Sequence, residues 1–403
     1  MRKVAVFFHR YVGLLLAAIL FLSGITGSII AFNHELDAWL NPGILTTTAV
    51  GARLPAETWI HVVQSSRPTE IVGYVEVPQR PDAPAVVYSY ALPPDGDLAK
   101  LVTFQVFVDP STAKVLGVRE RGAFVLDRLH IMPFLYQFHY SLHLGQWGVW
   151  LFGGLAILWF FDSFVGLFLA WPKRAWQAVK QALTVKWRSS ATRVNYDLHR
   201  AGGIWVFAVL LVLAFTGFSM NLHEELFVPL LNAVAPESDS PADAAPFRAD
   251  PSQPLTTTVP QALAAADQAL KDRQINAELG GIFIDHLKGF YAIGYHAKSD
   301  IMAEHPGLWV SVSGDEGKAV HVRPANGSTL GDVVHDWQFP LHSGKAFGLG
   351  GRIFISAMGL IVAMLSVTGV VIWWKKRRAR AARPATVPVA AADRVLPDVV
   401  TAS

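Results

Sequence analysis

Residues 11–33 read YVGLLLAAILFLSGITGSIIAFN and contain no charged side chain. As an α-helix, a stretch of this length extends about 34 Å, which is enough to cross roughly 30 Å of hydrocarbon. Three further apolar runs have a similar length: Leu144 to Trp171, Ala201 to Leu222 and Ile353 to Trp374. Asp162 is the one charged residue inside them. The sequence therefore predicts a membrane α-helical bundle of four transmembrane helices.

The composition supports this prediction and excludes several kinds of partner and cofactor site. The 403 residues are 52% hydrophobic and 16% charged, which is too apolar for an ordinary soluble protein. The formal net charge of +3 comes without a basic stripe in the polar segments, so no nucleic-acid partner is expected. The chain has no cysteine, which excludes disulfides, Cys-ligated clusters and covalently attached c-type haem. Any haem must be bound non-covalently.

The distribution of charge predicts the orientation. Residues 172–200 carry seven basic side chains against one acidic side chain, and the tail opens with four consecutive basic residues. The long connections lean acidic, with 8 basic against 11 acidic residues in 33–143 and 9 against 16 in 223–352. Because positive residues stay cytoplasmic, both termini are expected inside and the long connections outside. A cleaved signal peptide is the alternative for the first run, but the run is long for one and no A-x-A site follows it.

Each long connection has the pattern of an α+β domain. Both contain an amphipathic helix (56–65 and 259–272), short alternating strands (71–77 and 281–284) and a hairpin-like turn (106–115 and 309–318). The predicted organisation places transmembrane helices at 1–33, 143–172, 201–222 and 351–374, outer domains at 34–142 and 223–350, a basic cytoplasmic loop at 173–200, and a disordered cytoplasmic tail at 375–403.

The two halves repeat one another. His9 precedes Gly13 by four residues and Gly27 by eighteen, and His199 precedes Gly203 and Gly217 by the same numbers. The even-numbered spans pair through Leu142-His143 with Leu341-His342, and through Ser163-x-x-Gly166 with Ser366-x-x-Gly369. The sequence thus predicts an internal tandem duplication with a pseudo-two-fold axis along the membrane normal.

Six histidines fall at matched positions at the ends of the spans: His9, His199, His34, His223, His143 and His342. A histidine at a helix end is commonly just an interfacial residue, and duplication would copy it. Neutral imidazole is also a common axial ligand of haem iron, and helical bundles hold cofactors between facing helices. The matched positions therefore predict two haem b groups, one of them held by His9 and His199 at the cytoplasmic side.

Small residues accompany these histidines. Gly13 and Gly203 lie one helical turn after His9 and His199 on the same face, where they would leave room for a porphyrin. Gly27 and Gly217 are explained equally well by haem binding and by close packing of helices.

The sequence leaves the ligands of the outer haem open. His143 with His342, His34 with His223, or crossed pairs that hold two haems would each satisfy the symmetry. His139 ranks lower because its aligned position in the second half is Gln338.

Asp162 breaks the symmetry, because its counterpart is Leu365. An acid inside a span is costly and usually functional. We expect Asp162 to interact with a histidine ligand or to take up a proton near the cytoplasmic haem, the alternative being contact with interfacial water.

The sequence resembles the PepSY-associated transmembrane family over roughly residues 1 to 380. The resemblance rests on four motifs in this order: Leu198-His199-Arg200-x-x-Gly203, Thr216-Gly217, the Leu-His-x-Gly motif that opens each even-numbered span, and the glycine, tryptophan and basic residues that close it. The turn at 108–114 resembles that of PepSY domains. The resemblance implies a bacterial inner-membrane protein. Its siderophore-reductase branch binds two b-type haems and reduces ferric siderophores in the periplasm, which would make this chain an oxidoreductase of iron uptake.

The resemblance also implies the partners of such a reductase. They are a ferric siderophore or another iron chelate, and an electron donor that is either a quinol or a cytoplasmic reductase. No catalytic side chain can be named from the sequence. The alternative function is a non-catalytic PepSY membrane protein that binds peptides or regulates proteases.

Overall fold

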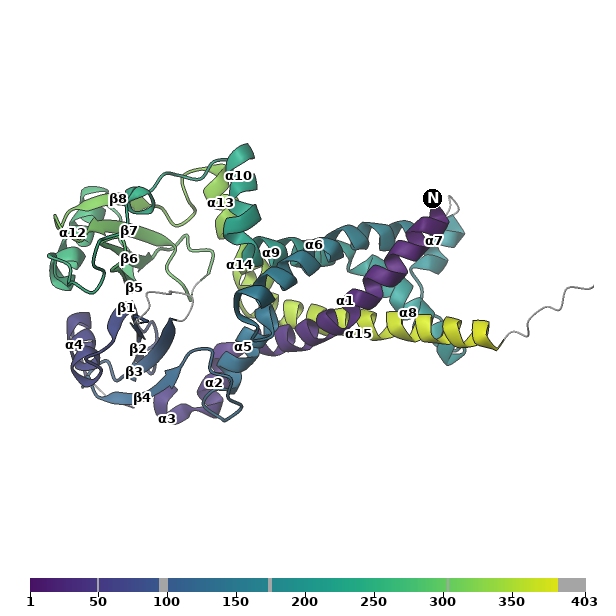
Figure 1. Ribbon diagram of the computed structural model, residues 1–403, viewed down its shortest axis with the longest axis horizontal. Coiled ribbons are helices and arrows are strands. Elements are labelled where there is room, and N and C mark those ends of the chain that lie inside the picture. The colour runs from purple at the N-terminus through teal and green to yellow at the C-terminus, as the bar shows by residue number, and fades with distance from the viewer. Residues whose placement is uncertain (49–50, 94–100, 173–175, 303, 383–403) are drawn as a thin grey trace, which may run out of the picture.

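A computed structural model describes residues 1–48, 51–93, 101–172, 176–302 and 304–382. It consists of a bundle of long helices with a β-sheet lobe at one end (Figure 1). The amino terminus lies at the end of the bundle remote from the sheet (Figure 1).

Among the described residues, three helices of the bundle are long and apolar enough to cross a membrane: α1 (Arg2–Ile30), α6 (Gly145–Ala170) and α15 (Gly348–Ala381). A fourth crossing is possible through α8 (Ala191–Trp205) and α9 (Phe207–Asn221), which are bent by 70° at the break between them. The predicted span over 201–222 is therefore not one continuous helix. The break follows the pair Gly202-Gly203, and such glycine pairs are a common cause of helix kinks.

The last helix extends farther than expected. Lys375–Ala381, predicted to begin a disordered tail, continues α15 as a helix. The rest of that tail, residues 383–403, lies outside the described residues, as do Lys173 and Arg174 of the predicted basic loop.

The outer surface of the bundle is apolar. Leu15, Phe161 and Leu360 are exposed on three different helices, which would be costly in water but is natural in lipid. Trp171 and Trp374 are exposed near helix ends, where membrane proteins concentrate aromatic side chains. The chain is accordingly a multi-pass membrane protein.

In the part of the chain that the structure describes, eight antiparallel strands form one sheet in the order β4-β3-β2-β1-β5-β6-β7-β8. The strands are β1 (Ile71–Glu76), β2 (Ala85–Ala91), β3 (Val102–Val108), β4 (Val115–Glu120), β5 (Glu278–Asp285), β6 (Phe290–His296), β7 (Leu308–Ser313) and β8 (Ala319–Arg323). Each half of the chain supplies a four-stranded meander, and β1 pairs with β5 through Val75 opposite Ile282. The two outer segments therefore share a sheet, where the sequence suggested two separate domains.

One hydrophobic core serves both meanders. The predicted amphipathic helices, α4 (Ala56–Ser66) and α12 (Val259–Asp272), pack on the sheet with buried residues that include Trp59, Val63 and Ala266. Val75 and Ile282, the paired residues at the centre of the sheet, are fully buried in the same core.

Short helices connect the sheet to the bundle, except for α7 (Trp176–Ala182), which lies at the far end (Figure 1). They are α2 (Asn33–Leu40), α3 (Pro42–Leu45), α5 (Ile131–Ser141), the π-helical turn η2 (His223–Phe227), α10 (Val228–Val234), α11 (Pro241–Ala244), α13 (Leu330–Asp336), α14 (Gln338–Ser343) and the 3₁₀ turn η3 (Lys345–Phe347).

Candidate functional site: two facing histidine pairs

The first pair lies at the end of the bundle remote from the sheet. His9 on α1 and His199 on α8 have ring centroids 6.1 Å apart. They are the two residues that the sequence predicted to act together. A glycine of the neighbouring helix packs behind each ring, because a Cβ on Gly166 would lie 3.2 Å from the Cε1 of His9 and one on Gly369 would lie 3.1 Å from the Cε1 of His199.

The two rings of this inner pair have different partners. The Nδ1 of His9 lies 2.9 and 3.0 Å from the two carboxylate oxygens of Asp162, which is buried in α6. The Nδ1 of His199 lies 3.0 Å from the carbonyl oxygen of Leu365 and 3.1 Å from the hydroxyl of Thr368. In both cases the Nδ1–H can donate, which leaves Nε2 with a free lone pair. Asp162 therefore contacts a candidate ligand, as expected. The contact is made to His9 and not to His199.

The second pair lies at the sheet end and is neither of the symmetric pairs suggested by the sequence. The ring of His342 on α14 faces His139 on α5, with centroids 6.2 Å apart. Thr216 contacts the Nδ1 of His342 at 2.8 Å, and Thr26 contacts the Nδ1 of His139 at 3.0 Å. Each hydroxyl donates to the carbonyl four residues earlier in its own helix. Its oxygen can therefore accept the Nδ1–H of the imidazole, which again leaves Nε2 free.

His143 has a different environment. Its φ is +57°, in the turn that ends α5, and its ring stacks on Phe134 at a centroid distance of 4.3 Å. Its Nε2 bonds to the carbonyl oxygen of Phe134 at 3.0 Å. His143 and His342 are therefore not the facing pair at this end of the bundle.

A signal for His139 was present in the sequence. His139 precedes Gly166 by 27 residues, and His342 precedes Gly369 by the same number, whereas His143 precedes Gly166 by 23. Aligning the even-numbered spans on their far ends would thus have matched His139 with His342. The short Leu-His-x-Gly motif shifted the alignment by one helical turn, and Gln338 is not the counterpart of His139.

The remaining two candidates lie in other surroundings. The Nε2 of His34 is 3.5 Å from a carboxylate oxygen of Glu304. The Nε2 of His223 is 3.2 Å from the Nε2 of His335, a residue that the sequence did not single out. The suggested pair of His34 with His223 is not the facing pair at this end of the bundle.

The glycines near the histidines fall into two groups. Gly27 packs behind His139, since a Cβ there would lie 2.9 Å from the ring, and Gly217 lies behind His342 with a corresponding distance of 3.9 Å. Gly13 and Gly203 are different, because a Cβ at either position would meet nothing within 4 Å. Gly27 and Gly217 thus pack against the imidazoles, whereas Gly13 and Gly203 leave space one helical turn from the inner pair.

Each facing pair can bind one metal ion from opposite sides. Metal–imidazole bonds are about 2.0 to 2.1 Å long, as in zinc sites, so two imidazoles in line across one ion have ring centres roughly 6 Å apart. The distances of 6.1 and 6.2 Å meet this requirement. Along α1 the two pairs are separated by the 17 residues from His9 to Thr26, or about 25 Å.

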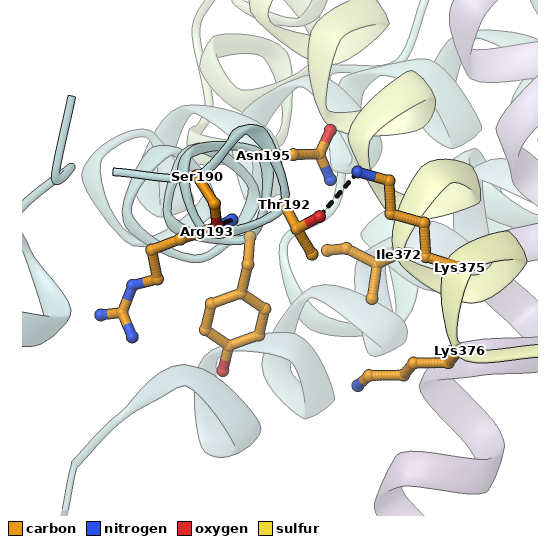
Figure 2. Close-up of a pocket in the computed structure, with 8 residues that line it drawn as sticks. Ser190, Thr192, Arg193, Asn195, Ile372, Lys375 and Lys376 are labelled. Atoms are coloured by element: carbon orange, nitrogen blue, oxygen red, sulfur yellow. Dashed lines mark hydrogen bonds between the residues drawn. The ribbon is translucent and has the colours of Figure 1, made fainter. Parts of the chain in front are cut away.

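A hollow lies between α8 and α15 (Figure 2). Three basic side chains, Arg193, Lys375 and Lys376, line it, and Lys375 donates to the hydroxyl of Thr192 at 2.8 Å. Asn195, also in the lining, donates to the carbonyl oxygen of Thr368, whose hydroxyl contacts His199. The hollow is thus linked to His199 through two residues, Asn195 and Thr368.

Ionisable groups gather where the sheet meets the outer end of the bundle. Burial raises the pKa of Glu76 on β1, against the opposing charges of His34 and Lys345. Burial also raises the pKa of Tyr88 to about 12 and lowers that of His305 to about 4. Glu304 bonds to Lys345 and lies 3.7 Å from Arg352 at the start of α15. These groups form a polar cluster that joins the sheet to the start of α15.

Comparison with known proteins gives one family. Residues 7–376 match the family described as the PepSY-associated TM region. No curated protein matches the chain significantly. The matched range includes both histidine pairs and the whole sheet.

Proposed function

The chain belongs to the PepSY-associated TM family, and on that premise we propose that it is a di-haem b electron conduit that reduces a ferric siderophore outside the bacterial inner membrane. The observation that carries the proposal is the pair of facing imidazole sets, with ring centroids 6.1 and 6.2 Å apart, at opposite ends of the bundle. Iron in haem takes axial histidine ligands, and helical bundles commonly hold such cofactors between facing helices.

In this proposal His9 and His199 hold the inner haem, and His139 and His342 hold the outer one. Bound haem supplies a one-electron carrier at each site. The protein keeps every Nε2 available by giving every Nδ1–H an acceptor: Asp162, Leu365, Thr216 and Thr26. Gly13 and Gly203 leave space beside the inner rings.

The proposal includes an orientation. The end with His9 is cytoplasmic, because the basic residues at 375–378 lie there. An electron from a quinol or a cytoplasmic reductase enters beside the inner pair, where the hollow of Figure 2 presents Arg193, Lys375 and Lys376. The sheet and the outer pair are then periplasmic.

The substrate is an iron chelate that binds on the periplasmic side. Hard, oxygen-rich chelators hold Fe(III) far better than Fe(II), so a one-electron reduction releases the metal. The outer segments lean acidic, and like charges repel at low salt. Neutral or cationic ferric chelates are therefore better substrates than anionic ones.

Haem content tests the sites. Protein purified in detergent from haem-replete cells is expected to contain two haems that acid–acetone extraction removes. His9→Ala and His199→Ala should each remove about half of the haem, and the double variant little more. His139→Ala or His342→Ala should remove the other half.

His143→Ala, one turn from His139, is the matched control and should keep both haems. A colourless, folded preparation would refute the conduit and favour the peptide-binding alternative.

Electron transfer tests the reaction. Protein reduced with dithionite is mixed in a stopped-flow instrument with a ferrioxamine-type or a carboxylate-type ferric chelate. We expect faster haem reoxidation by the former, and a slower rate in His342→Ala. Reoxidation no faster than in buffer would leave a membrane haem protein without reductase activity.

A further inference from the structure

His223 and His335 meet at the junction of the sheet and the bundle with an unusual geometry. Their Nε2 atoms are 3.2 Å apart, and their ring centroids are 4.8 Å apart at an interplanar angle of 62°. The rings are too close for ligands on opposite sides of one haem iron. The distance instead suits two adjacent ligands of one ion, since nitrogens about 2.0 to 2.1 Å from a tetrahedral metal are roughly 3.3 Å apart.

The other nitrogen of each ring faces a carboxylate. The Nδ1 of His335 bonds to Glu237, and the Nδ1 of His223 lies 2.9 Å from Glu224. A carboxylate oxygen accepts a hydrogen bond, so each Nδ1 carries the proton. In the neutral tautomers both Nε2 atoms then present lone pairs to each other. That contact is repulsive unless a cation lies between them, either an extra proton or a metal ion.

The partners match the surroundings of metal-binding histidines. Such histidines usually donate their second N–H to a carboxylate, which orients the ring and makes it a better ligand. The nearby cation Arg323 pairs with Asp336 at 2.8 Å, which leaves the carboxylate of Glu237 with His335. His223 also opens the π-helical turn η2, and π-turns within helices are frequent at functional sites.

The site is accessible. About a third of each imidazole side chain is exposed, 32% for His223 and 36% for His335. Among the described residues no group of three or more histidine, cysteine or acidic side chains is arranged to hold a metal. The pair thus offers two protein ligands, and water would complete the coordination.

We propose that His223 and His335 bind a divalent first-row transition metal ion at the outer face of the bundle, at a site distinct from the two facing pairs. Imidazole ligands favour zinc, copper, nickel and iron over magnesium or calcium. The first half of the chain has no equivalent site. When the two halves are aligned so that His139 matches His342, the position that corresponds to His335 is Met132, which cannot replace the imidazole. The site does not depend on the proposed haem function.

Zinc titration of the full chain in detergent, with any purification tag removed, tests this proposal by calorimetry and by equilibrium dialysis. The wild type is expected to bind one zinc ion more than His223→Ala or His335→Ala does. Glu237→Gln keeps the ligands but removes the carboxylate, and should weaken binding about 10- to 100-fold. His61→Ala, which removes an exposed histidine of α4, is the control and should bind as the wild type does.

Equal zinc affinity in the wild type and in both histidine variants would overturn the proposal and leave a hydrogen bond shared through a proton. Unchanged melting temperatures confirm that each variant is folded. Because zinc does not change oxidation state, the result is independent of any reductase activity.

Discussion

At the scale of single residues, His9 and His199 are matched in sequence but differ in their hydrogen-bond acceptors. The Nδ1 of His9 faces the carboxylate of Asp162, whereas that of His199 faces a backbone carbonyl and a hydroxyl. A carboxylate gives the imidazole more anionic character and makes it a more basic ligand. Such a ligand stabilises ferric over ferrous iron, so Asp162 should set the potential of the inner site.

Asp162→Asn is therefore expected to raise the midpoint potential of the proposed inner haem while that haem is retained. A rise on the order of 60 mV would correspond to a tenfold change in the ferric-to-ferrous preference of a one-electron couple. Spectroelectrochemical titration measures this potential. Thr368→Val, on the His199 side, is the control, because the carbonyl of Leu365 still accepts the Nδ1–H. An unchanged potential in Asp162→Asn would show that the carboxylate does not tune the site.

At the scale of helices, glycines position the outer pair unequally. A Cβ on Gly27 would lie 2.9 Å from the ring of His139, but one on Gly217 would lie 3.9 Å from the ring of His342. The first distance requires the ring to move, and the second is an ordinary contact.

We expect Gly27→Ala to lower the occupancy of the proposed outer haem, because the shifted imidazole no longer faces its partner. Gly217→Ala should bind haem as the wild type does. The haem-to-protein ratio and the fraction of haem reduced at each potential distinguish the two sites. Equal behaviour of the two variants would mean that the glycines do not position the rings.

The β3–β4 turn shows how one carboxylate stabilises an element of the sheet. Asp109 accepts hydrogen bonds from the hydroxyls of Thr47 and Ser111 and from the backbone N–H groups of Ser111 and Thr112. Burial opposes ionisation, but these bonds outweigh it and lower the pKa of Asp109 from 3.8 to about 2. The folded-state pKa is the lower one, so the stabilisation is complete above about pH 4 and is lost as the pH falls towards 2.

Asp109→Asn should therefore destabilise the sheet by up to roughly 2 kcal/mol at neutral pH, with a smaller difference at low pH. Melting temperatures of the two proteins in detergent, compared at pH 6 and pH 3, measure the effect. A difference that is independent of pH would show that the charge of Asp109 does not contribute.

At the scale of the whole molecule, the proposed orientation assigns the sheet to the periplasm and α7 to the cytoplasm. The absence of cysteine in the sequence makes this directly testable. Ser65 on α4 and Ser189 before α8 are both exposed, and each can be replaced singly by cysteine.

In intact spheroplasts, a membrane-impermeant maleimide is expected to label Ser65→Cys and not Ser189→Cys. Permeabilised cells should show labelling of both. Labelling of Ser189→Cys alone in intact spheroplasts would reverse the orientation and place the inner pair on the periplasmic side.

The sequence by itself determined the features that depend on local pattern. Charge-free runs predicted membrane helices, alternation predicted the strands, and the amphipathic helices α4 and α12 were predicted nearly to the residue. The adjacency of His9 and His199 also followed, because equal spacing on two matched helices leads to equal depth in the bundle.

The tertiary structure alone decided which groups meet across the chain. Pairing of β1 with β5 is a contact between residues some 200 positions apart, and no local pattern encodes it. The ring that faces His342 depends on where α5 ends, and two left-handed residues, Leu142 and His143, turn the chain there and leave His139 facing inward. His335 meets His223 because α13 folds back onto the π-turn. Sequence spacing fixes depth along a helix, whereas only packing fixes which side chains face one another.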